Sequence, residues 1–445
     1  MVTALPEPTR EEIARREVGR TDISRGTARV LVALFLTAIA AVPIAQRGIE
    51  TWGEEVAATA WSILAPVPGV VGSGWARARG DRASLFASVV AANREGLRAL
   101  DAFESAVEDE AWLAQALRSP VQYVLSGWLG VGNEQVWLGR ERWLFYRPDV
   151  EYLTGPPFLA PERLEERRRE GREWETPPQP DPRPAIVEFA RQLDARGIAL
   201  VVMPTPVKPA IHPEKLAAAY GAPIENPSYG AFIRDLEDAG ILVFDPTDAI
   251  VAVRRRDDRA VYLATDTHWR PEIVELVAER LAAFLVDRAG LPPTPPVGHT
   301  AAPAEIAHTG DLTMMLDLPR GQGLYPPDRV LVRRIIDPDG RPWRSSRSAG
   351  VLLLGDSFSN IYSLGSMGWG DAAGFAEQLS FALHQPLDRI VQNDAGAYAT
   401  RAMLRRELLA RPDRLAATRV VVWQFAAREL ALGDWRAIEL PAGER

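Results

Sequence analysis

Residues 351–360 read VLLLGDSFSN, and this stretch decides how the rest of the chain is interpreted. Four apolar residues run directly into Gly355, Asp356 and Ser357, which predicts a buried strand that ends at a small residue, an acid and a hydroxyl. A simple turn accounts for these residues, because Gly, Asp and Ser are common after strands. The alternative is a nucleophilic Ser357 at the carboxyl end of a strand, where open α/β sheets bind their ligands. The remainder of the chain has to decide between the two.

The composition narrows the class of protein. The chain has 445 residues, so we expect one large domain with accessory segments. Its net charge is −8 and it has no extended basic patch, which argues against nucleic acid as a partner. It has no cysteine, so disulfides and thiolate metal sites are excluded. There is no glycine-rich nucleotide fingerprint, and we expect no bound cofactor.

An apolar run, VLVALFLTAIAAVPIA at 30–45, carries information about the cellular compartment. With residues 27–29 it approaches the length of a membrane-spanning helix, about 17–25 residues. A signal peptide cleaved near Ala38-Ile39-Ala40 and a buried soluble helix are the alternatives. Arginines crowd the side before the run and mark it as cytoplasmic: Arg10, Arg15, Arg16, Arg20, Arg25 and Arg29. We therefore predict a single-pass inner-membrane protein with a cytoplasmic leader (1–26), an anchor (27–45) and a periplasmic catalytic domain.

Beyond the anchor, the pattern predicts a helical membrane-proximal segment (46–130), an α/β domain (131–435) and a tail (436–445). A proline-dense linker (176–184) precedes an alternation of apolar strands and amphipathic helices. The predicted strands are 198–206, 241–248, 260–269, 351–357, 388–394 and 419–426. Such alternation predicts a doubly wound, mostly parallel sheet. The proline-rich segment from about 291 to 347 is expected to be an irregular insertion.

A serine nucleophile needs a base within hydrogen-bond reach and an acid that orients the base. Among five histidines, His268 lies in ATDTHWRPE, after a predicted strand and just before a helix. Asp266 is two residues away, so in extended backbone both side chains share one face. Two alternatives to an acid–base pair remain open. Asp266 or Thr267 caps the helix that Pro271 begins, or acid and base form a metal pair, although no further ligand follows at a recognisable spacing.

These motifs resemble the SGNH (GDSL-type) hydrolase superfamily. VLLLGDS resembles its first block and DTHWRPEIVELVAERLAAFL its last, although here the serine comes late in the chain, as in a circular permutation. That order, with Asp-x-His-Trp, resembles the alginate O-acetyltransferase family over about residues 130–435. The resemblance is carried further by VWLGRERWLFYRPDVEYLTG, MPTPVKPAIHPEK, TGDLTMML and VVWQFAAREL. It implies a catalytic triad of Ser357, His268 and Asp266.

The resemblance also implies an oxyanion hole, with Gly396 as one donor. The superfamily's third block normally carries an asparagine after the strand that here ends in VVVWQFA, but this chain has Ala426, Ala427, Arg428 and Glu429. Losing one such donor costs about 2.7–4 kcal/mol in comparable sites, so a substitute is expected. Asn393 and Arg428 are candidates. Further candidates for substrate contacts are Lys208, Trp269 and Tyr146, and a glycan groove is expected to be lined by Trp143, Tyr146, Trp269 and Trp369.

The family implies an O-acetyltransferase that modifies an exopolysaccharide in the periplasm through an acyl-serine. It also implies a membrane-bound O-acyltransferase as the partner that supplies acetyl groups, since acetyl-CoA is cytoplasmic. A polysaccharide acetyl esterase would use the same triad with water as acceptor. A non-catalytic polysaccharide-binding or assembly subunit would keep the fold without the reaction.

Overall fold

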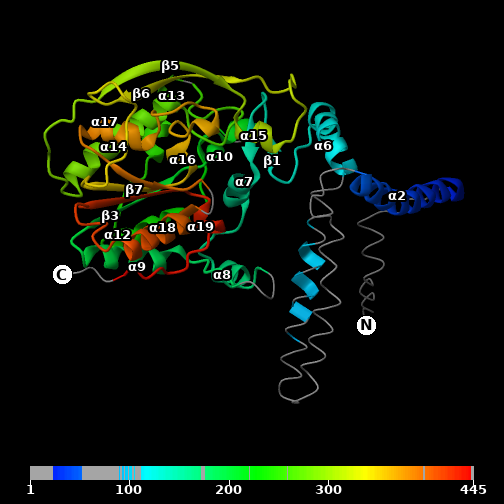
Figure 1. Cartoon of the computed structure of the whole chain (residues 1–445), viewed down its shortest axis with the longest axis horizontal. Coiled ribbons are helices and arrows are strands. Elements are labelled where there is room, and N and C mark those ends of the chain that lie inside the picture. The colour runs from blue at the N-terminus through cyan, green and yellow to red at the C-terminus, as the bar shows by residue number, and fades with distance from the viewer. Residues whose placement is uncertain are drawn as a thin grey trace, which may run out of the picture. The chain divides into compact units, whose positions relative to one another are not determined.

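A computed structural model gives the fold (Figure 1). It describes residues 24–52, 90, 93–94, 96–98, 100–102, 105, 112–171, 176–219, 221–257, 259–393 and 396–441. The chain divides into two compact units, Met1–Leu117 and Arg118–Arg445. Helix α2 (Arg25–Trp52) includes the predicted anchor at 27–45, while most of the predicted leader and of the segment 46–130 lies outside the described residues. Within the described residues, no helix combines the length and apolar character needed to cross a bilayer.

The second unit is built on a five-stranded parallel sheet with the order β4-β3-β9-β7-β8. The strands are β3 (Ala199–Thr205), β4 (Leu242–Val243), β7 (Val351–Gly355), β8 (Asp388–Val391) and β9 (Val420–Ala426). The last strand of the described part of the chain, β9, is therefore the middle strand of the sheet. The predicted parallel α/β sheet is confirmed.

Both faces of this sheet are covered, which explains why its strands are apolar at nearly every position. On β7, Val351 and Leu353 enter one hydrophobic cluster, whereas Leu352 and Leu354 enter the other. The first cluster lies under α14 (Pro271–Asp287) and α17 (Phe375–Leu383). The second lies under α9 (Pro182–Asp194), α12 (Tyr229–Asp238) and α18 (Gly396–Ala410), on the opposite side of the sheet in Figure 1. The fold is doubly wound, as the alternation predicts.

Two predicted strands differ from the structure. The stretch 241–248 forms only the two-residue strand β4. Residues 260–269 form no strand; a single bridge joins Tyr262 and Trp269. The backbone of this loop instead forms hydrogen bonds between its own residues. It also bonds to a neighbouring hairpin, where Leu144 N donates to Ala264 O (2.9 Å). This loop carries Asp266 and His268, so its irregular path decides where they point.

The insertion at 291–347 is not irregular, and that prediction was wrong. It contains the long antiparallel hairpin of β5 (Thr300–His308) and β6 (Asp328–Ile336), with α15 (Gly310–Met315) in the connection. Prolines and charged residues obscure the alternation along these strands, although Val330, Val332 and Ile335 point into the core.

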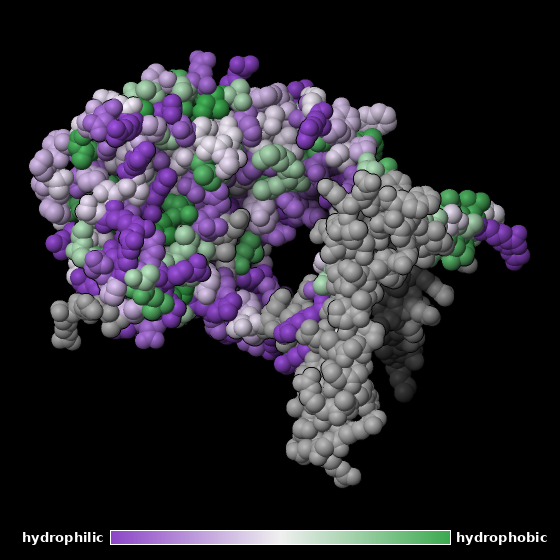
Figure 2. All heavy atoms as spheres, in the orientation of Figure 1, coloured by the Kyte–Doolittle hydropathy of each residue, from purple (hydrophilic) through white to green (hydrophobic). Residues whose placement is uncertain are grey.

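Shorter elements complete the second unit. The aromatic segment after residue 131 forms a small hairpin, β1 (Val136–Leu138) with β2 (Leu144–Tyr146). The short helices are α6 (Trp112–Val124), which crosses the boundary between the units, α7 (Arg147–Thr154), α8 (Pro161–Arg168), α10 (Lys208–Ile211), α11 (Pro213–Leu216), α13 (Thr247–Asp257), α16 (Ser357–Asn360) and α19 (Glu429–Leu432). The face seen in Figure 2 is a mixture of hydrophilic residues and scattered hydrophobic ones over this unit.

The strand register brings the functional motifs to one edge. Thr205 at the end of β3 pairs with Ala426 at the end of β9, and Leu354 of β7 pairs with Trp423 of β9. Ser357 therefore follows the end of a strand next to the middle of the sheet. From the middle of the sheet, the connection after β3 leads to β4 on one side, and the connection after β7 leads to β8 on the other side. Doubly wound sheets form their ligand-binding crevices where the connections diverge in this way.

Candidate active site

A network of hydrogen bonds clamps the turn that carries Ser357 onto β9. The buried Asp356 carboxylate accepts from Phe358 N (2.9 Å), Gln424 Nε2 (2.9 Å) and Ala426 N (2.7 Å). Gln424 Oε1 in turn accepts from Asp356 N (3.1 Å) and from Ser359 Oγ (2.7 Å). The acid in Gly-Asp-Ser is thus a structural residue that caps α16 and holds Ser357 at its first position.

Asp266 and His268 form a buried pair, as predicted. His268 Nδ1 donates to Asp266 Oδ1 (2.6 Å), and the other Asp266 oxygen accepts from Trp369 Nε1 (2.8 Å) and Asp311 N (3.0 Å). Burial alone would raise the pKa of Asp266, but the charge and hydrogen bond of His268 and the Trp369 bond lower it to about 2. The carboxylate is therefore ionised and fixes the tautomer with the proton on Nδ1.

The other imidazole nitrogen is left free. His268 Nε2 is buried and has no hydrogen-bond partner among the described residues. The His268 ring packs edge-on against Phe358, the residue after Ser357, with ring centroids 4.8 Å apart. Burial alone would lower the pKa of His268, yet the charge and hydrogen bond of Asp266, with Asp311 and Asp356, raise it. The ring lies next to the serine turn, although no hydrogen bond joins Ser357 Oγ to Nε2 within the described residues.

Lys208 lies beneath the loop that carries Asp266 and His268, and it does not lie in a substrate site. Its side chain is fully buried, and Nζ donates to the carbonyl oxygens of Leu144 (2.5 Å), Ala264 (2.9 Å) and Asp266 (2.9 Å). Desolvation lowers its pKa to about 8. The predicted substrate contact is corrected: Lys208 ties the β1–β2 hairpin to the loop that holds Asp266.

The predicted aromatic groove is also corrected. Trp269 and Trp369 are completely buried and Trp143 is 6% exposed, so these tryptophans belong to the core. Trp269 Nε1 donates to Phe358 O (3.1 Å) and thereby joins the histidine loop to the serine turn. Of the four predicted aromatic side chains, only Tyr146 is partly exposed.

The oxyanion candidates lie in three different environments. Gly396 begins α18, and a Cβ there would collide with the carboxyl group of Glu429, which occupies the space beside it. Asn393 Oδ1 accepts from Asn360 Nδ2 (2.8 Å), which ties it to the helix of Ser357. Arg428, the third candidate, contacts Asp149, which lies in the motif VWLGRERWLFYRPDVEYLTG but was given no role from the sequence.

The carboxylate of Asp149, which pairs with Arg428, is completely buried. Arg428 Nη1 donates to Asp149 Oδ1 (2.9 Å), and the guanidinium lies over the Tyr146 ring at 5.2 Å from the centroid. Burial raises the pKa of Asp149, while Arg428, His268 and Lys208 oppose that rise. Burial alone would lower the pKa of Arg428. The negative charge of Asp149 opposes this effect, and the net shift of the pKa is upward. Arg428 is thus fixed in orientation at the end of β9.

Three residues at the site were not among the predicted ones: Asp149, Gln424 and Asp311. Gln424 had a visible signal, since it is a polar residue inside the apolar strand VVVWQFA. Asp311 lies in TGDLTMML, a motif that carried the family resemblance without a role for its acid. Asp311 Oδ2 is 3.7 Å from His268 Nδ1, and its Oδ1 accepts from Thr267 N (2.8 Å).

Asp266, His268 and Asp311 place one donor atom each within 4.8 Å of one another, a spacing that a metal ion could use. Both oxygens of Asp266 and one oxygen of Asp311 already accept N–H groups. The shortest of these contacts is the acid–base bond itself. The hydrogen bonding therefore favours proton transfer over cation binding.

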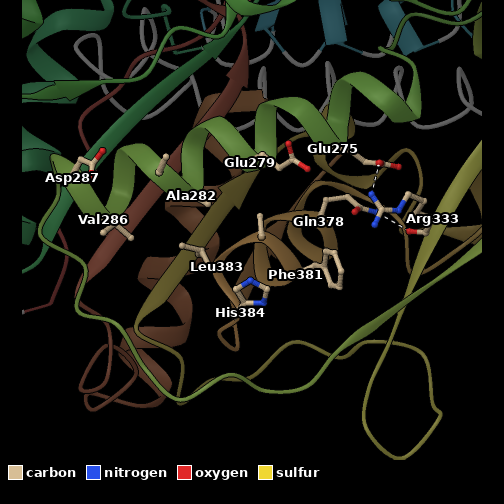
Figure 3. A pocket seen from close by; sticks show the side chains of 12 residues that line it. Glu275, Glu279, Ala282, Val286, Asp287, Arg333, Gln378, Phe381, Leu383 and His384 are labelled. Atoms are coloured by element: carbon tan, nitrogen blue, oxygen red, sulfur yellow. Dashed lines mark hydrogen bonds and ion pairs between the residues drawn. The ribbon is translucent and has the colours of Figure 1, made fainter.

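A groove of about 510 Å³ follows α14, α17 and β6 (Figure 3). Within it Arg333 pairs with Glu275 (2.9 Å) and lies over the Phe381 ring at 5.6 Å. The groove is also lined by His384, which precedes β8 and so lies toward the amino edge of the sheet. None of the predicted site residues lines this groove.

Comparison with known proteins identifies the family of this chain. The family model for the SGNH hydrolase-like domain of acetyltransferase AlgX matches residues 136–427. The probable alginate O-acetylase AlgJ of Pseudomonas aeruginosa is 30% identical over 310 residues, which is 68% of this chain and 72% of that protein. The AlgJ of Azotobacter vinelandii is 26% identical over 358 residues, 77% of this chain and 84% of that protein.

Among solved structures, the O-acetyltransferase domain of Pseudomonas putida AlgJ superposes with a TM-score of 0.50 at 24% identity, covering 67% of this chain and 93% of that domain. This similarity shows the fold. The match over residues 136–427 and the relative at 30% identity mean that the chain belongs to the AlgX family of SGNH hydrolase-like domains and is an acetyltransferase.

Proposed function

We propose that the chain transfers acetyl groups to hydroxyls of an acidic exopolysaccharide such as alginate, through an acetyl-serine at Ser357. The observation that carries this proposal is the buried Asp266–His268 pair with a free Nε2 beside the serine turn. The relatives at 26–30% identity that are named probable alginate O-acetylases support alginate as the acceptor.

The reaction has two balanced steps. Ser357 Oγ attacks the carbonyl carbon of an acetyl donor while His268 Nε2 takes the serine proton, and the same proton then passes to the departing donor oxygen. A polysaccharide hydroxyl next attacks the acetyl-serine. Nε2 removes the hydroxyl proton and returns it to Ser357 Oγ as the C–O bond to serine breaks.

Negative charge that develops on the acetyl oxygen needs donors. The amide of Ser357 at the start of α16 is one such group. Arg428, held in place by Asp149 and Tyr146, supplies a fixed positive charge at the neighbouring strand end in place of the missing asparagine. Asn393 reaches the same helix through Asn360.

The cellular setting is part of the proposal. We infer a periplasmic domain held at the inner membrane by the segment at 27–45, with acetyl groups relayed by a membrane-bound O-acyltransferase. The arginine asymmetry supports this topology. So do the apolar side chains on α2, which form the green band of that helix in Figure 2 and are 53–64% exposed: Val30, Leu31, Val32, Leu34, Phe35 and Leu36.

The test measures the intermediate and the acceptor separately. The full chain is mixed with a chromogenic acetyl ester and intact mass is recorded, with Ser357→Ala beside it. The control is Ser363→Ala, which removes a neighbouring hydroxyl that donates to Glu377. We expect one added acetyl group on wild type and on Ser363→Ala, and none on Ser357→Ala. Acetylation of Ser357→Ala would refute the nucleophile.

Mannuronate oligomers and neutral cello-oligosaccharides are then added as acceptors. A transferase discharges its acetyl group faster when a bound hydroxyl has the advantage of proximity. Acetylated mannuronate oligomers support the proposal. Release of free acetate at the same rate with every acceptor would establish an esterase instead.

A further inference from the structure

His268 faces a second carboxylate in addition to Asp266. Asp311 Oδ2 lies 3.7 Å from His268 Nδ1, and it comes from a different element, α15. Unlike Asp266, it is not completely enclosed, and its side chain is 21% exposed. The histidine loop is thus held between two acids from separate parts of the chain.

The backbone fixes Asp311 in this position. Its amide donates to Asp266 Oδ2 (3.0 Å), and its Oδ1 accepts from Thr267 N (2.8 Å), so it bonds to two successive residues of the loop. Gly310 precedes it at φ +69°, and a Cβ there would lie 2.5 Å from Thr265 O. Only glycine permits this close approach of the two backbones. The geometry is therefore specified by the sequence Thr-Gly-Asp and is not a chance surface contact.

The chemistry gives this second acid a use. Each acyl-transfer step leaves the proton of the attacking hydroxyl on Nε2, so the imidazole becomes a buried cation. Asp266 compensates this charge through its bond to Nδ1. A second carboxylate at 3.7 Å adds to the stabilisation of the cation without competing for the Nδ1 proton.

Other ionisable groups also face this region and form the background for any titration: Asp356 from the serine turn, Asp149 from α7, Lys208 from α10, Tyr146 from β2, and Asp328 and His308 from the β5–β6 hairpin. Of these, Asp328 accepts from Thr265 N (3.0 Å) and Thr265 Oγ1 (2.9 Å). Both bonds tie its carboxylate to Thr265, and neither of them reaches His268.

We propose that Asp311 is a positioning residue that, together with Asp266, orients His268 and stabilises its protonated form during acetyl transfer. This inference rests on the proposed role of His268 as the base. Burial and the charge of Asp266 raise the pKa of Asp311 to about 6.

The first test compares Asp311→Asn with Asp328→Asn in the full chain. The side-chain amide oxygen of Asp311→Asn can still accept from Thr267 N, so the substitution removes mainly the charge. We expect kcat/KM for a chromogenic acetyl ester to fall about tenfold, or about 1.4 kcal/mol of transition-state stabilisation. The acid limb of its pH profile should move to lower pH, because a lost negative charge makes the imidazolium easier to deprotonate. Asp328→Asn should leave that limb in place.

The second test does not depend on activity. The chain is labelled with ¹⁵N-histidine, and the ring nitrogens of His268 are titrated by NMR, with His268→Gln identifying the signal among five histidines. The pKa of His268 should be lower in Asp311→Asn than in wild type. If wild type fails to form acetyl-Ser357 while this shift is present, the proposed function fails together with the role of Asp311 in acetyl transfer, and only the stabilisation of the protonated imidazole by Asp311 stands. An unchanged pKa of His268 in Asp311→Asn, or an equal shift in Asp328→Asn, would overturn the inference about Asp311.

Discussion

Replacing Gln424 with leucine should destabilise the domain and disable the serine turn together. Gln424 is 1% exposed and makes four hydrogen bonds, with Asp356 N, Ser359 Oγ, Thr205 Oγ1 and Asp356 Oδ1. Leucine has nearly the same size but satisfies none of them. The Asp356 carboxylate would keep its bonds from Phe358 N and Ala426 N, whereas two donors, Asp356 N–H and the Ser359 hydroxyl, would lose their acceptor.

A buried donor without a partner costs about 1–3 kcal/mol. Two such donors, partly offset by the apolar leucine, predict a loss of about 2–4 kcal/mol in the free energy of unfolding. Ser359→Ala removes one of the donors together with its bond and should cost only about 1 kcal/mol. In the double variant the Ser359 hydroxyl no longer exists to be stranded, so the two losses should not add.

The assay is urea unfolding of wild type, both single variants and the double variant, followed by near-ultraviolet circular dichroism. The rate of Ser357 acetylation is measured in parallel on the folded proteins. We expect Gln424→Leu to slow acetylation while Ser359→Ala has little effect. A Gln424→Leu protein within about 0.5 kcal/mol of wild type, or strictly additive variants, would refute the claim that this side chain holds the turn.

The other predictions concern the acid and the buried lysine. Asp266→Asn should reduce the rate of Ser357 acetylation by about 10⁴-fold, because an amide that donates to Nδ1 stabilises the wrong tautomer; a rate within about tenfold of wild type in a single-turnover mass assay would argue against an acid–base pair. Lys208→Met tests how the protonation of the buried Lys208 makes the free energy of unfolding depend on pH. The pKa of Lys208 is lowered from 10.5 to about 8, so between these values the unfolded chain binds more protons and the stability that Lys208 contributes rises with pH. The difference in unfolding free energy between wild type and Lys208→Met should therefore shift in favour of wild type from about pH 8 to about pH 10, and a difference that does not change with pH would contradict it.

Periodicity and composition predict the sheet well because its central strands are buried on both faces. Val351 to Leu354 and Val420 to Val422 leave no polar face, which is the pattern of a covered parallel sheet. The same reasoning fails at 260–269, where Tyr262 and Leu263 suggest a strand although the backbone bends to present Asp266. Local apolar content does not show which carbonyl groups a distant lysine will bind.

The site is only partly visible in the sequence for a related reason. Asp266 and His268 are two residues apart, so their pairing follows from local geometry. Asp311 meets the same loop from 45 positions away, and Asp149 meets Arg428 from 279 positions away, so neither pair has a local signal. The tryptophans were misassigned because an indole suits a buried core with one hydrogen bond as well as it suits a sugar surface.

The position of β9 has a consequence for how the protein folds. This strand is the last in the chain among the described residues, yet it lies between β3 and β7 and joins the two halves of the sheet. Before it is added, the parallel sheet can form only as the separate pairs β3–β4 and β7–β8, and isolated two-stranded pieces are marginal in water. Synthesis must therefore deliver nearly the whole chain before the sheet can close. Contacts so distant in sequence predict slow folding, and removing residues from 420 onward should leave no partly active remnant.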